Sequence, residues 1–197
     1  MAISQAPVPD FAEPPVDVAR QLPEFRERLE QLLHAPVNRQ AVLRRDLAAS
    51  IQSSPVPVFL LHEVVRQGCL RGGPHSFDIA IDLLSGFDAP LLEVFRSFVS
   101  KDKPRWDRHL TAGHINDDVG YVLLRSLARS KVPLPAKLDA IKDCLHLGTS
   151  SLREAAAIAL GDLGGDDAKN LLRQVIANDA DSLVRDSAKE ALDDLGE

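Results

Sequence analysis

The segment from Arg96 to Asp118, "RSFVSKDKPRWDRHLTAGHINDD", holds the densest mixture of chemically useful side chains in the sequence. Basic residues outnumber acidic ones there, and aromatic side chains, including the only tryptophan, lie among them. Guanidinium groups pair with anions and tryptophan offers rigid contact area, so Arg105, Trp106 and Arg108 are candidate partner-binding residues. A loop between helices in which Trp106 is only a packing anchor explains the same residues, and we favour that interpretation.

Metal and catalytic chemistry find little support in the sequence. His109, His114, Asp117 and Asp118 carry suitable ligand atoms, but a spacing of five residues does not place both histidines on one helix face, so we expect no zinc site. The sequence has no G-x-S-x-G elbow, P-loop or dinucleotide-binding fingerprint. We therefore expect no catalytic residue, no metal and no cofactor, and a protein that binds rather than an enzyme.

The net charge of −6 is concentrated in the C-terminal part. From Ser150 onward there are five basic and eleven acidic residues, which accounts for the whole net charge. An acidic surface repels phosphates and favours a basic protein surface, although it also serves solubility alone. Another protein is therefore the expected partner, and nucleic acid is disfavoured.

Cysteine usage and hydropathy indicate the compartment. Cys69 and Cys144 are far apart in the sequence and have no CxxC partner, which is typical of reduced thiols rather than of a disulfide scaffold. The first residues do not resemble a secretory signal, and no run of eighteen apolar residues occurs. We expect a cytoplasmic protein that does not insert into a membrane.

Helical periodicity predicts the elements that must position these residues. Four prolines within residues 7–15 predict a disordered arm over residues 1–15. In residues 18–34 the apolar side chains Leu22, Phe25, Leu29, Leu32 and Leu33 form one helical stripe, with Pro23 expected in the first turn of the main part. A second helix over residues 37–52 is expected to turn Val37, Ala41, Leu43, Leu47 and Ile51 inward.

An internal repeat is the strongest signal. The segment "SLREAAAIALGDLG" from Ser151 matches "LVRDSAKEALDDLG" from Leu183 when Arg153 is aligned with Arg185, at a constant offset of 32 residues. Alanines three apart, such as Ala156 and Ala159, allow a neighbouring helix to approach closely. Ser150 and Ser182 are expected to cap the two helices.

These segments resemble the HEAT family, most closely the short repeats named after phycobiliprotein lyases. The resemblance implies an all-α, right-handed α-solenoid of antiparallel helix pairs, in which an "A" helix is followed by a "B" helix that lines the concave face. Residues 115–197 are expected to form HEAT-like repeats, with Leu124 and Leu127 where the small alanines would stand. Residues 16–114 are expected to form divergent helix pairs.

The resemblance implies a scaffold or adaptor that binds a partner protein, in a bacterial cytoplasm. The expected partner-binding residues lie on the "B" helix of the best-defined repeat: Lys169, Asn170, Arg173, Gln174 and Asn178. Two alternatives stay open. A lyase-like subunit or chaperone for a cofactor-bearing protein would act as a hetero-oligomer, and a DNA-glycosylase-like protein would need a positive groove.

Overall fold

A computed structural model describes residues 15–99 and 114–196 of the chain. Within these residues the chain forms ten α-helices and no strand, which confirms the predicted all-α class. The expected arm over residues 1–15 lies almost wholly outside the described part. The helices are α1 (Val16–His34), α2 (Val37–Ser53), α3 (Pro57–Arg71), α4 (Pro74–Leu84), α5 (Ala89–Val99), α6 (His114–Arg129), α7 (Leu134–Leu147), α8 (Ser150–Leu163), α9 (Gly165–Asn178) and α10 (Ser182–Asp194).

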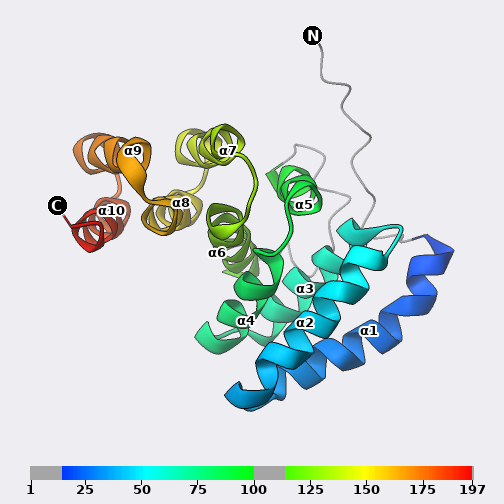
Figure 1. Ribbon diagram of the computed structural model, residues 1–197. Helices are drawn as coiled ribbons and strands as arrows, with labels where there is room; N and C mark the ends of the chain where they lie inside the picture. Colours follow the sequence, from blue (N-terminus) through cyan, green and yellow to red (C-terminus); the bar gives the residue numbers. More distant parts are fainter. Residues whose placement is uncertain (1–14, 100–113, 197) are drawn as a thin grey trace, which may run out of the picture.

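The helices stack in chain order into an elongated array. Helices α1 to α4 pack on one another at one end, α6 lies in the middle, and α8, α9 and α10 form the other end (Figure 1). A single continuous cluster of buried apolar side chains runs through the described residues from Phe25 to Ala191. This arrangement is an α-solenoid, as the sequence predicts.

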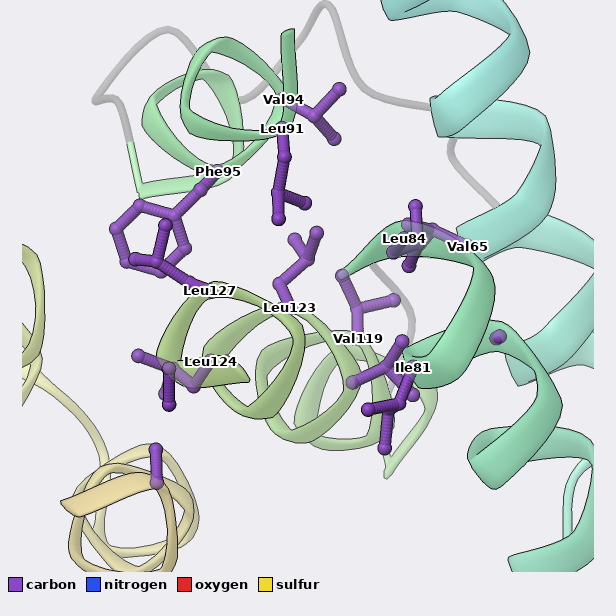
Figure 2. Close-up of a cluster of buried hydrophobic side chains, with 14 of the residues drawn as sticks. Val65, Ile81, Leu84, Leu91, Val94, Phe95, Val119, Leu123, Leu124 and Leu127 are labelled. Atoms are coloured by element: carbon purple, nitrogen blue, oxygen red, sulfur yellow. The ribbon is translucent and has the colours of Figure 1, made fainter. Parts of the chain in front are cut away.

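Helix α6 carries the centre of the core. It packs on α3, α4, α5 and α8, so nearly its whole circumference is covered. Leu123 of α6 points toward α5 and α4, while Leu124 points toward α8 and Leu127 lies beside Phe95 of α5 (Figure 2). The leucines that replace the small alanines of the later repeats therefore fill space that the helices around α6 leave open.

The helix ends correct one prediction. Thr149 and Asp181 cap α8 and α10, with the side-chain oxygens accepting hydrogen bonds from the amides of Leu152 at 3.3 Å and Leu183 at 2.9 Å. Ser150 and Ser182, the expected caps, are already helical. A cap residue must keep an extended backbone just outside the helix, and Thr149 and Asp181 meet that condition.

The predictions for α1 and α2 are partly wrong. Pro23 lies inside α1 rather than in its first turn, because the helix already begins at Val16. In α2, Leu47 and Ile51 are buried as expected, but Val37 is 80% exposed and Ala41 is also exposed. The reason is that α1 and α3 pack on one side of α2 and leave the side that bears Val37 and Ala41 uncovered.

Candidate functional site

Helices α6, α8 and α10 form a closely spaced row, and small residues make that spacing possible. A Cβ atom added to Gly120 of α6 would lie 2.6 Å from Leu152 Cδ1, and one added to Gly161 of α8 would lie 3.1 Å from Ala191 Cβ. Ala156 and its repeat equivalent Ala188 are fully buried. The two alanine-rich helices are therefore equivalent members of one stack, as the 32-residue repeat predicts.

The second layer, α7 and α9, is more widely spaced. Each of these helices packs across onto α8, and α9 also packs on α10, but the two do not pack closely on each other (Figure 1). A stack bends toward the layer whose members lie closer together, so α6, α8 and α10 form the inner side of the array. The expectation that the "B" helix α9 lines the concave face is therefore corrected: the tight contacts of the small residues put the alanine-rich helices there.

An arginine at equivalent positions of α8 and α10 binds the turn that precedes its helix. Arg153 Nη1 donates to the carbonyl of Gly148 at 3.1 Å, five residues earlier, and Arg185 Nη1 donates to the carbonyl of Ala180 at 3.0 Å with the same separation. Arg153 also binds the carboxylate of Asp179. Hydrogen bonds from Arg153 hold the pKa of Asp179 below its ordinary value and raise the pKa of the guanidinium. The repeated arginine is a structural residue.

A second ion pair joins α6 to α8. Arg125 donates to both oxygens of Asp162, at 2.5 Å and 3.0 Å, and Arg129 donates to it at 2.7 Å. Arg125 also donates to Tyr121 Oη at 2.6 Å. Burial would raise the pKa of Asp162, but the hydrogen bonds from Arg125 and Arg129 outweigh it, and the pKa lies below its ordinary value. Arg125, Arg129 and Asp162 therefore hold α6 against α8.

The outer flank of α10 differs from the corresponding flank of α8. On α8, the small residues Ala157 and Gly161 lie in the side that faces α10. At the equivalent positions, 32 residues later, α10 carries Lys189 and Asp193, which are both exposed. The flank of α10 that corresponds to the α10-facing flank of α8 therefore carries charge in place of small residues.

The predicted partner-binding residues on α9 face solvent in the outer layer. Asn170, Arg173, Gln174 and Asn178 are exposed, and Lys169 is half-buried. Arg173 Nη1 donates to Asn170 Oδ1 at 2.9 Å, and Asn178 Nδ2 donates to the carbonyl of Gln174 at 2.9 Å. The structure therefore places these five residues on one helix, away from the inner side. Arg105, Trp106 and Arg108 lie outside the described residues, and their role stays a prediction.

The inner side carries apolar residues that the sequence analysis missed. Leu183 of α10 is 66% exposed. Ile158 of α8 is partly exposed and does not belong to the core cluster. Ile158 of α8 is equivalent to Glu190 of α10, 32 residues later. Glu190 lies two turns after Leu183, on the same side of α10. Leu183 and Ile158 therefore both lie on the inner side. The repeat in the sequence carries a signal for Ile158 and Leu183, because the 32-residue offset aligns α8 with α10 residue by residue.

Carboxylates surround these two apolar residues. Asp186 and Glu190 are exposed on α10, and Glu154 of α8 lies beside Ser187, whose hydroxyl donates to it at 3.1 Å. Asp186 has one weak partner, Lys189, at 3.5 Å with both side chains largely exposed. The inner side of α8 and α10, defined by Glu154, Ile158, Leu183, Asp186 and Glu190, is hereafter the acidic inner face.

The residues 15–99 and 114–196 contain no group of three or more histidine, cysteine or carboxylate side chains arranged to hold a metal ion. Asp117 and Asp118 belong to α6, whereas His109 lies outside the described part. None of the helices described is both long enough and apolar enough to span a bilayer.

The fold and its stacked helices define an α-helical repeat protein. Residues 109–193 match the model of a family described as HEAT repeats, so this part of the chain is an array of HEAT repeats. The match does not narrow the family to the phycobiliprotein-lyase subclass, which stays an expectation. No curated protein and no solved structure shows significant similarity to the chain.

Proposed function

We propose that the protein is a scaffold or adaptor that binds a partner protein through the acidic inner face, and that it is not an enzyme. HEAT repeats commonly serve protein interaction. The observation that carries the proposal is the exposure of Leu183 beside Glu154, Asp186 and Glu190 on the inner side of the row. An uncovered apolar residue within a rim of charge is typical of an interaction surface.

The proposed partner presents a basic segment that also carries apolar side chains. Leu183 and Ile158 offer apolar contact, and the surrounding carboxylates attract lysine and arginine and speed the encounter. The buried charges of the repeats have structural partners instead: Asp162 is bound by two arginines, and Asp179 is bound by Arg153. This supports binding rather than catalysis.

The experiment is affinity purification of the tagged protein from its native host, with mass spectrometry of the bound proteins and three matched baits. The first bait is the natural chain, the second carries Leu183→Ser and Glu190→Lys on the inner face, and the third carries Arg173→Ala and Gln174→Ala on α9. We expect the second bait to lose its partner and the third to keep it. The reverse result would move the site to α9, and equal capture by all three baits would contradict both sites.

The two alternatives have their own signatures. Salt-sensitive binding of duplex DNA would support the nucleic-acid alternative, although the acidic residues from Ser150 onward oppose it. Tetrapyrrole absorbance of the purified protein would support the lyase-like alternative. No contact described above favours either of them.

A further inference from the structure

A hollow lies between α2 and α4, at the other end of the array from the acidic inner face. It has a volume of about 340 Å³. Its walls come from small or apolar residues and three charged ones: Ala41, Arg44, Arg45, Ala48, Asp82, Leu83 and Gly86. The hollow exists because alanines and a glycine stand where larger side chains would fill the space between the two helices.

A stripe of apolar residues on α2, interrupted by Arg44 and Arg45, leads into the hollow. Val37, Ala41 and Ala48 are separated by four and seven residues, so they lie on one side of α2. Val37 is 80% exposed, Ala41 is exposed and Ala48 is half-buried. The stripe spans about 16 Å along the helix. Val37 and Ala41 are thus left without a covering helix in the described part of the chain, and Arg44 and Arg45 lie between Ala41 and Ala48 on the same side.

The charged side chains that line the hollow are two arginines and one aspartate, so its lining is net positive. One oxygen of Asp82 is engaged, because Oδ2 accepts a hydrogen bond from Arg44 Nη1 at 2.6 Å. Arg44 Nε is buried and has no acceptor among the described residues. The Arg45 side chain is 76% exposed, and its Nε donates a long hydrogen bond to Oδ1 of the adjacent Asp46 at 3.4 Å. An occupant that supplies an acceptor therefore complements this site better than one that supplies a donor.

We infer that the hollow between α2 and α4 is a docking site for a helix of a partner protein that inserts an apolar side chain beside a carboxylate. The apolar side chain fills the space over Ala41, Ala48 and Leu83, while the carboxylate binds Arg45 at the rim and approaches Arg44. A helix matches the length of the stripe and presents anchors three to four residues apart. The site takes an acidic partner, whereas the acidic inner face takes a basic one, so the two proposals are independent.

The test uses the full chain and two kinds of probe. The first probe, 4-phenylbutanoate, combines a ring with a carboxylate, and its neutral control is 4-phenylbutan-1-ol. The second is an alanine-based helical peptide of fifteen residues with a central leucine and a glutamate four residues to each side, and its control has lysine in place of both glutamates. Binding is followed by the backbone amide shifts of the isotope-labelled protein.

We expect 4-phenylbutanoate to shift the amides of Ala41, Arg45 and Gly86, and the alcohol to bind about fivefold more weakly, because it lacks the charge. The glutamate peptide should shift the same amides and displace 4-phenylbutanoate, whereas the lysine peptide should not. If the small carboxylate binds and the glutamate peptide does not displace it, the hollow accepts an anion but not a helix, and the proposal is overturned.

Variants separate the hollow from the rest of the surface. Ala41→Phe fills the hollow from an exposed position and should abolish both signals without changing the circular dichroism. Arg45→Gln should reduce the affinity for the carboxylate to that for the alcohol. Arg39→Gln, an exposed arginine of α2 that does not line the hollow, is the matched control and should leave binding unchanged. Equal binding of 4-phenylbutanoate and the glutamate peptide by the natural chain and by Ala41→Phe would contradict the proposal.

Discussion

Arg153, near the start of α8, binds the carboxylate of Asp179 at the end of α9 with two parallel hydrogen bonds, from Nε at 2.8 Å and from Nη2 at 3.0 Å. Arg153 also donates to the carbonyl of Gly148 in the preceding turn. One side chain thus connects the turn before α8 to the turn after α9. The pair is mostly shielded from water, so it contributes more than a surface ion pair.

Removing this carboxylate is expected to destabilise the repeats. Asp179→Asn should lower the free energy of unfolding by about 1.5–3 kcal/mol, because a guanidinium loses a charged acceptor in a partly buried site. Chemical denaturation in urea measures the change. The matched control is Asp186→Asn, which breaks an exposed contact with Lys189 at 3.5 Å and should cost less than about 0.5 kcal/mol. Equal effects of the two variants would contradict the structural role of Asp179.

The arginine-bound carboxylates of Asp162 and Asp179 predict that the folded protein loses stability in acid. The pKa values of Asp162 and Asp179 lie below their ordinary value of 3.8 in the folded chain. Their contribution to stability is therefore complete above about pH 4 and is lost as the pH falls through the folded values. Thermal unfolding at several pH values should show a steep loss of stability below pH 4. In the double variant Asp162→Asn, Asp179→Asn the stability should fall less steeply with decreasing pH. An unchanged dependence of stability on pH would contradict the role of these two carboxylates.

The tight contact between α8 and α10 predicts a graded response at Gly161. Alanine adds a Cβ that comes 3.1 Å from Ala191 Cβ, a crowded contact that the gain in helix propensity of about 0.5–1 kcal/mol offsets. Gly161→Ala should therefore change stability little. Gly161→Asp brings a carboxylate into the contact and should destabilise by more than about 2 kcal/mol. Denaturation of the two variants side by side is the measurement, and a tolerated aspartate would mean that α10 does not pack as described.

Both thiols are expected to be inert in the folded protein. Burial raises the pKa of the Cys144 thiol to about 12 and also raises that of Cys69. Only the thiolate reacts with disulfide reagents, so neither cysteine should react at pH 8 until the chain unfolds. Titration with a chromogenic disulfide reagent, with and without denaturant, counts the reactive thiols. Rapid reaction of the native chain would show that at least one of these helices opens readily.

The helices themselves were predictable from the sequence because they depend on local signals. The apolar stripe around Leu29 and the 32-residue repeat place α1, α8 and α10 within a few residues of their observed bounds. Burial of Ala156 and Ala188 was also predictable, since small residues three or four apart are useful only against a neighbouring helix.

The curvature of the array and the exposure of single faces were decided by tertiary packing. The choice of α8 and α10 over α9 for the inner side depends on how closely Gly161 lets two helices approach. Val37 and Leu183 have the apolar character of core residues, but they are exposed because no described helix covers them. Periodicity states which side of a helix is apolar; only the positions of the other helices determine whether that side is buried or left for a partner.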